Sequence, residues 1–178
     1  PDTVALALEV AGEAVAASGR AAAALPSVFA SSHGDLAIND HLCSTLAGTP
    51  TLISPTKFHN SVLNAAAGYW TMAAGCHAAS TAITAFDASF ANALLAGAVQ
   101  CATDDHAVLV AAYDIEAVGA LASVTRSTGL LAVALVLAPG TTRPGGQVSA
   151  SSSVMSTRTL PVTPATVAMV APLVAFDS

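Results

Sequence analysis

Residues 80–113, STAITAFDASFANALLAGAVQCATDDHAVLVAAY, decide the fold because they hold a strand, a helix and a second strand in direct succession. The β-branched content of Ser80–Phe86 predicts a strand. The segment from Asp87 to Ala102 is small and apolar and begins on an acid, which favours a helix because a carboxylate stabilises the positive end of the helix dipole. Residues 107–113 form another apolar strand. This order predicts a layered α/β sheet with short crossover connections.

The same alternation of helices and strands extends toward both ends of the chain. We expect helices over residues 3–19, 35–46 and 60–74, and strands over residues 27–32 and 129–137. Asp2 is a candidate N-cap of the first helix, Gly19 ends that helix, and Gly75 ends the third. We interpret residues 1–178 as one domain, in which residues 140–178 are less regular because Ser, Thr and Pro are frequent there.

The composition is apolar and poor in charge. Hydrophobic residues make up 54% of the 178 residues and charged residues 9%, against about 25% charged in an average domain. Disorder is excluded because a disordered chain is poor in apolar residues. Five scattered basic residues and a net charge of −6 argue against nucleic-acid binding. So few charges indicate that much of the surface lies against another subunit; the alternative is a compact, alanine-rich monomer from a GC-rich genome.

The sequence contains no clear signal for membrane insertion, a disulfide framework or a metal site. The most apolar stretch, Gly129–Pro139, is shorter than the ~20 residues of a transmembrane helix, and no signal peptide is visible. Cys43, Cys76 and Cys101 are widely spaced and form no CxxC pair, so neither disulfides nor zinc are expected. We therefore expect a cytoplasmic protein without a cofactor. Because the sequence begins with Pro1, we also expect a further N-terminal segment.

The junction Phe86-Asp87-Ala88-Ser89 is the most suggestive place for a functional site. Side chains at a strand-to-helix junction face the ligand crevice of α/β sheets, and the helix N-terminus stabilises anions. Asp87 is either a helix cap or a residue that faces a pocket, and both interpretations stay open. His33, between an expected strand and an expected helix, is a second candidate; the alternative is a simple turn histidine.

A longer motif, Ser54-Pro-Thr-Lys-Phe-His-Asn-Ser-Val-Leu-Asn-Ala-Ala-Ala-Gly-Tyr-Trp-Thr71, resembles the β-ketoacyl synthases. The similarity runs without a gap from Ser54 to Tyr113 and extends more loosely to the turn at residues 31–35. Three shorter motifs resemble the branch of chain-length factors found in aryl polyene gene clusters: His33-Gly-Asp, Phe58-His-Asn-Ser-Val and Ala66-Ala-Gly-Tyr-Trp70. The resemblance implies a thiolase-like layered α/β fold, a mixed sheet with helices that amounts to about one half of a full ketosynthase.

Two departures from the family pattern bear on catalysis. The family nucleophile is a cysteine at the strand-to-helix junction, where the ungapped alignment places Asp87; a carboxylate cannot hold an acyl thioester as a thiolate does. A full synthase also uses two histidines from its second half, whereas all five histidines here lie between His33 and His106. The resemblance therefore implies a noncatalytic chain-length factor with no catalytic residue of its own.

The resemblance also implies a partner and a ligand. Such a factor pairs with a catalytic ketosynthase, as a heterodimer or a higher assembly, and shapes the tunnel that receives a polyene or fatty acyl chain bound to acyl carrier protein. The implied dimer interface is the strand before the junction: Thr81, Ala82, Ile83, Thr84, Ala85 and Phe86. The implied tunnel and gating residues are His33, Leu36, Ile38, Leu42, Lys57 and Phe58. For the three aliphatic residues, ordinary core packing is the alternative.

Two other functions stay open from the sequence. One is an active acyltransferase, hydrolase or condensing enzyme that uses Cys76 or Ser80 with a nearby histidine. The other is a purely structural scaffold of a ketosynthase complex, without an acyl tunnel.

Overall fold

The structure, a computed structural model, describes residues 2–123, 125, 127 and 129–139. Within these residues four strands form one sheet: β1 (Ser27–Ala30), β2 (Ser80–Ile83), β3 (Val108–Asp114) and β4 (Leu131–Leu137). Their order in space is β2-β1-β3-β4. The strand β1 pairs in parallel with β2 and with β3, whereas β4 runs antiparallel to β3. The sheet is therefore mixed, as expected.

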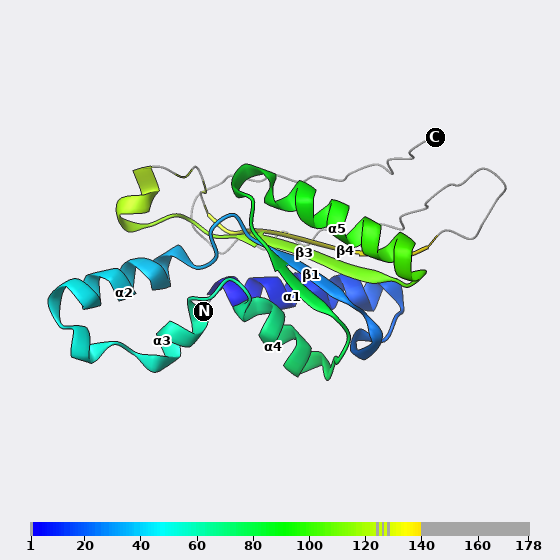
Figure 1. The fold of residues 1–178 in the computed structure, drawn as a ribbon, viewed down its shortest axis with the longest axis horizontal. Helices are drawn as coiled ribbons and strands as arrows, with labels where there is room; N and C mark the ends of the chain where they lie inside the picture. The colour runs from blue at the N-terminus through cyan, green and yellow to red at the C-terminus, as the bar shows by residue number, and fades with distance from the viewer. Residues whose placement is uncertain (1, 124, 126, 128, 140–178) are drawn as a thin grey trace.

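Helices cover both faces of this sheet (Figure 1). The helices α1 (Asp2–Ser18) and α4 (Ala65–Ala74) lie on one face, and α5 (Ser89–Asp104) lies on the other. Two more helices, α2 (Leu36–Gly48) and α3 (Pro55–Asn60), project beyond one end of the sheet (Figure 1). No helix in the described part of the chain is long and apolar enough to cross a membrane.

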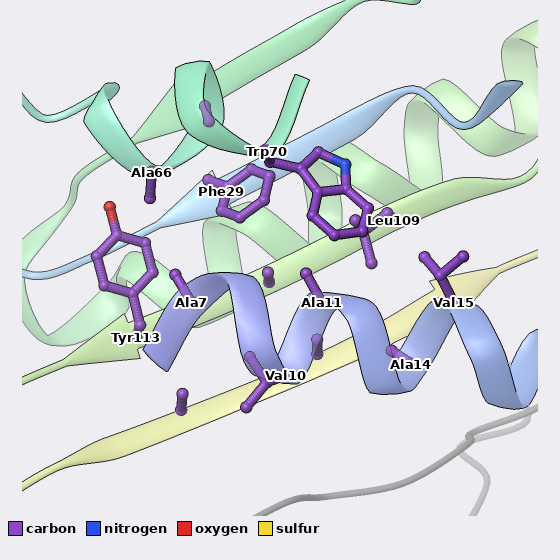
Figure 2. Packing of buried hydrophobic residues seen from close by; sticks show 14 of the residues in the cluster. Ala7, Val10, Ala11, Ala14, Val15, Phe29, Ala66, Trp70, Leu109 and Tyr113 are labelled. Carbon is purple, nitrogen blue, oxygen red and sulfur yellow. The ribbon is translucent and has the colours of Figure 1, made fainter. Parts of the chain in front are cut away.

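The main core lies between the sheet and the helices α1 and α4 (Figure 2). Ala7, Ala11 and Ala14 follow one face of α1 and are completely buried, so small side chains bring this helix close to the sheet. Two of the aromatic residues of this core, Phe29 and Trp70, lie with their ring centroids 6.4 Å apart. The alanine-rich composition therefore serves close helix–sheet packing.

A smaller core lies on the opposite face, beneath α5. Ala93, Gly97 and Cys101 recur every four residues and form the buried stripe of this helix. A Cβ atom on Gly97 would clash with the side chain of Val110 in β3, so only glycine permits this approach. The outer face of α5 is also apolar, with Leu95 63% exposed.

Two sequence signals for helix ends, Gly19 and Gly75, are confirmed, and the structure adds a cap at Asp35. Asp35 is the N-cap of α2, where its side chain accepts a hydrogen bond from the backbone N–H of Ile38 at 2.9 Å. Gly19 follows α1 with φ of 66°, and Gly75 caps α4 with φ of 58°, a left-handed conformation that glycine adopts without steric cost. The expected cap Asp2 instead lies inside the first turn of α1.

Two expected boundaries are wrong. The helix expected over 60–74 begins only at Ala65, as α4, and the residues before it form a separate short helix, α3, which starts at Pro55 and is capped by Ser54. The strand expected over 80–86 ends at Ile83, and Phe86–Ala88 form a 3₁₀ turn. Beyond the strand, the backbone N–H of Ala85 donates to the hydroxyl of Ser89 rather than to the sheet, and the hydroxyl of Thr84 donates to the carbonyl of Ser32. The expectation for residues 140–178 lies outside the described residues.

Candidate functional site

The candidate site lies at the sheet edge where the parallel strands β1, β2 and β3 have their carboxyl ends. Residues 31–35 follow β1, residues 84–88 follow β2, and Asp114 ends β3. Ligands of α/β proteins bind at this edge because the loops that follow parallel strands meet there. Both sequence candidates, His33 and Asp87, lie in these loops.

Asp114 joins the end of β3 to the loop that follows β1. Its Oδ1 accepts hydrogen bonds from the hydroxyl of Ser31 and the backbone N–H of Ser32, both at 2.8 Å. Its Oδ2 accepts a third, from the hydroxyl of Ser32 at 2.8 Å. Three donors on one carboxylate hold the start of the loop firmly.

The remainder of the same loop is held by its own side chains. The hydroxyl oxygen of Ser31, which is buried, accepts a hydrogen bond from the backbone N–H of Gly34 at 2.8 Å. The carboxylate of Asp35, also buried, accepts from Ile38 N–H and from the hydroxyl of Thr3 at 2.6 Å. The backbone around His33 is thus fixed on both sides.

The turn between β2 and α5 has an unusual backbone at Phe86. Its φ is 48°, in the left-handed region that bulky residues rarely adopt, and its side chain is 72% exposed. The buried hydroxyl of Ser89 accepts from the N–H of Ala85 at 2.8 Å and donates to the carbonyl of Phe86 at 2.7 Å. Asp87 is the next residue in this turn and is exposed.

The two loops contact each other. The hydroxyl of Thr84 donates to the carbonyl of Ser32 at 2.9 Å. The rings of His33 and Phe86 meet edge to face, with centroids 5.8 Å apart and an interplanar angle of 68°. The structure therefore brings His33 and Phe86 together, with Asp87 next to Phe86 in the chain.

The residues that the sequence analysis places beside a tunnel fall into two groups. Leu36 and Leu42 are buried and Ile38 is half-buried, all on α2. Lys57 is half-buried on α3, and Phe58 on the same helix is 63% exposed. The helices α2 and α3 contact each other, so these residues belong to one projecting unit next to the His33 loop.

The strand expected at a dimer interface, β2, lies at one end of the sheet. The carbonyls of Ala79 and Ile83 accept hydrogen bonds from Ser27 and Ser31, at 2.9 and 3.3 Å, and so face β1. Because successive residues of a strand alternate in direction, the backbone groups of Ser80 and Ala82 face the open edge of β2, the side on which no strand of the described residues lies. Thr84, Ala85 and Phe86, which the sequence analysis also places in this strand, follow it as a turn.

The two alternative nucleophiles lie elsewhere. Cys76 and Ser80 precede or begin β2, at the amino end of the strand and away from His33. The buried thiol of Cys76 donates to the carbonyl of Leu25 at 3.4 Å, and the hydroxyl of Ser80 pairs with that of Ser27 at 2.9 Å. Among the residues that the structure describes, no group of three or more His, Cys, Asp or Glu side chains is arranged to hold a metal ion.

The sequence analysis missed two contributors to this edge, Asp114 and the conformation of Phe86. The signal for Asp114 was present, because an aspartate directly follows the apolar run 107–113.

Tyr113, the residue before Asp114, has a perturbed pKa. Burial raises the pKa of its phenol to about 12, and the nearby carboxylates of Asp114 and Asp35 act in the same direction. The phenol therefore stays neutral and donates weakly to the carbonyl of Leu63 at 3.4 Å.

Comparisons with known proteins agree with this architecture. A solved structure described as a ketosynthase (ApeO) in complex with its chain length factor (ApeC), from Xenorhabdus doucetiae, contains a similar chain with a TM-score of 0.68 and 27% identity. The match covers 78% of the present chain and 57% of that chain, so the present chain spans little more than half the length of that subunit. No curated protein sequence matches the chain.

The family comparison covers nearly the whole chain. The sequence profile of the family described as "Beta-ketoacyl synthase, N-terminal domain" matches residues 5–170. Together with the mixed sheet and its helices on both faces, this match identifies the thiolase-like architecture. The chain belongs to the β-ketoacyl synthase N-terminal domain family.

Proposed function

We propose that this chain is a noncatalytic chain-length factor that pairs with a catalytic ketosynthase and shapes the tunnel for an acyl chain carried by acyl carrier protein. The observation that carries the proposal is the turn between β2 and α5, where the family has its nucleophile. That turn presents Phe86 and Asp87, neither of which has a thiol or a hydroxyl group. The similar solved structure is a complex of a ketosynthase with its chain length factor, which supports the assignment to such a two-subunit complex.

The hydroxyl of Ser89, at the end of this turn, is already in use as a structural group. Ser89 is buried, and its Oγ both accepts from Ala85 N–H and donates to the carbonyl of Phe86 within the described turn. A nucleophile needs an accessible atom and a base that removes its proton. Ser89 meets neither condition, which supports a noncatalytic role.

The open edge of β2 supports the pairing with a ketosynthase. Ser80 and Ala82 direct backbone groups away from β1, and an unpaired edge strand is a template for another chain. The low charge of the sequence fits an extensive subunit contact of the obligate class, more than about 2,000 Å² in total. The three free thiols fit a reducing compartment, so we place the complex in the cytoplasm.

A direct test follows the acyl group. The full protein is co-expressed with its ketosynthase, the complex is incubated with acyl carrier protein that bears an acyl chain, and the intact mass of each subunit is measured. We expect the acyl group on the ketosynthase alone. An acyl adduct on Cys76 or Ser80 of this chain would instead establish an active acyltransferase.

A kinetic variant complements the mass measurement. Asp87→Asn removes the charge at the turn and keeps the size of the side chain, so condensation by the complex should stay within a few-fold of the wild type. Removal of a general acid or base costs about 10²–10⁴-fold. A loss of that size in an assembled complex would give Asp87 a catalytic role and overturn the proposal.

A further inference from the structure

Phe86 combines three features that seldom occur together. It is a large aromatic residue, its φ of 48° is sterically unfavourable for a side chain of that size, and its ring is 72% exposed. A residue that only filled space would be buried, and a residue that only formed the turn would be glycine or asparagine. An unfavourable backbone conformation persists where the surrounding structure enforces it, and such positions gather at functional sites.

The surrounding structure does enforce the conformation of Phe86. Ser89, buried in the first turn of α5, bonds to the residue before Phe86 and to the carbonyl of Phe86 itself, at 2.8 and 2.7 Å. The N–H of Ala88 also donates to the carbonyl of Ala85 at 3.0 Å. These three hydrogen bonds fix the backbone of Phe86 and therefore the direction of its Cα–Cβ bond.

The ring is also braced from another strand. His33 contacts it edge to face at 5.8 Å, and the His33 loop is anchored by the bonds of Ser31 and Ser32 to Asp114. Thr84 ties the two loops together through the carbonyl of Ser32. The loops that carry the two rings are thus tied to each other and to the carboxyl end of β3.

We infer that Phe86, braced by His33, is a specificity-determining residue that limits the length of the apolar acyl chain. This inference rests on the proposed function. Phe86 follows β2, an edge strand among the described residues, after two intervening residues, so the chain leads directly from the edge proposed for the ketosynthase to this ring. An exposed aromatic ring at that place, held on one side by the His33 ring, opposes an apolar chain that extends from the partner's catalytic centre because the chain would have to displace it from that contact.

The first experiment changes the volume of this residue in the complex of the full protein with its ketosynthase. Phe86→Ala should shift the products toward longer chains and Phe86→Trp toward shorter ones, measured by mass spectrometry of the released acyl chains. Each two-carbon step that the ring blocks should change the ratio of longer to shorter products roughly tenfold, because two more CH₂ groups are buried. Size-exclusion chromatography verifies that the complex remains intact.

Phe90→Ala is the matched control. Phe90 is the same residue type one turn further along the chain, at the start of α5, and its side chain is 38% exposed. It should leave product length unchanged, and an equal shift in both variants would overturn the inference. Unchanged products from an intact Phe86→Ala complex, while Ile38→Ala still shifts them, would overturn the role of Phe86 and leave the proposed function standing.

Two further outcomes separate the inference from its alternatives. If Phe86→Ala no longer co-purifies with the ketosynthase, the ring is an interface anchor and the inference is wrong. If the wild-type protein forms no complex, the proposed function fails and this inference fails with it.

Thermal unfolding of Phe86→Asn adds an independent measurement. Asparagine tolerates a positive φ, so the unfolding midpoint of the variant should be equal to or higher than that of the wild type. A lower midpoint would show that the ring has a structural role.

Discussion

Asp114 and Ser32 are joined by two hydrogen bonds of 2.8 Å, one from the backbone N–H of Ser32 and one from its hydroxyl. This pair connects the last residue of β3 to the loop that carries His33, although the two residues are 82 positions apart in the chain. The position of His33 therefore depends on a carboxylate from another strand.

Asp114→Ala should destabilise the protein because it leaves Ser31 and Ser32 without their acceptor. Hydrogen bonds to a charged group contribute about 1.5–3 kcal/mol each, and a loss of about 3 kcal/mol in total is expected since water replaces part of them. Urea unfolding measures the change. Asp104→Ala, an exposed carboxylate at the end of α5, is the control and should have little effect. Equal stabilities of the two variants would contradict the role of Asp114.

Gly97→Ala should also destabilise the protein, by about 1–3 kcal/mol, as is typical when a methyl group is forced into a packed core. The added Cβ would meet Val110 and press α5 away from the sheet. Gly68→Ala in α4 is the matched control, because nothing lies within 4 Å of its added Cβ. Alanine is the better helix former by roughly 0.5–1 kcal/mol, so this control should be stabilising. Thermal or urea unfolding measures both changes. The decisive result is that the free energy of unfolding falls for Gly97→Ala and rises for Gly68→Ala.

Ala82→Pro should abolish co-purification with the ketosynthase. The backbone N–H of Ala82 faces the open edge of β2, so proline removes a donor for the partner and leaves the bonds between β1 and β2 in place. The unfolding midpoint of the chain itself should change little. Ile83→Lys tests the same edge with a charge, although Ile83 also packs against the α5 core. An Ala82→Pro variant that still forms the complex would contradict pairing through β2.

Of the two α2 residues Ile38 and Leu42, Ile38 is the better one for a test of product length. It is half-buried, so Ile38→Ala should lengthen the products of the complex and Ile38→Trp should shorten them without unfolding the chain. Leu42 lies four residues later on the same face but is buried, and Leu42→Ala should cost about 2–5 kcal/mol of stability in addition. Cys43→Ala, an exposed neighbour, is the control. Unchanged product lengths in a stable Ile38→Ala complex would remove Ile38 from the tunnel.

Tyr113 makes stability depend on pH in the alkaline range. Its pKa is raised from 10.0 to about 12 in the folded state, so folding favours the neutral phenol. This contribution is complete below pH 10 and is lost as the pH rises through about 12, because the unfolded chain ionises first and the folded chain only near the upper value. Two pKa units correspond to roughly 3 kcal/mol. Tyr113→Phe should remove this decline, and parallel stability curves of the two proteins from below pH 10 up to pH 12 would contradict it.

The sequence determined the elements whose signals are local. Apolar runs with β-branched residues predicted all four described strands, and β1 and β3 are almost fully buried as such runs require. Gly19 and Gly75 predicted helix ends because the positive φ that glycine permits acts within a few residues. The family could also be identified from the motif that starts at Ser54, which the profile match confirmed.

Only the tertiary structure decided how the loops at the functional edge are held. The strand before α5 ends at Ile83, and Thr84 then bonds through its hydroxyl to Ser32, a residue 52 positions away; no local pattern reports such a bond. In the same way the contact of His33 with Phe86 depends on Asp114 and Ser89, which reach the loops from β3 and α5. Secondary-structure propensity and hydrophobic periodicity depend on residues that are close in sequence. These hydrogen bonds instead form only after three strands lie side by side.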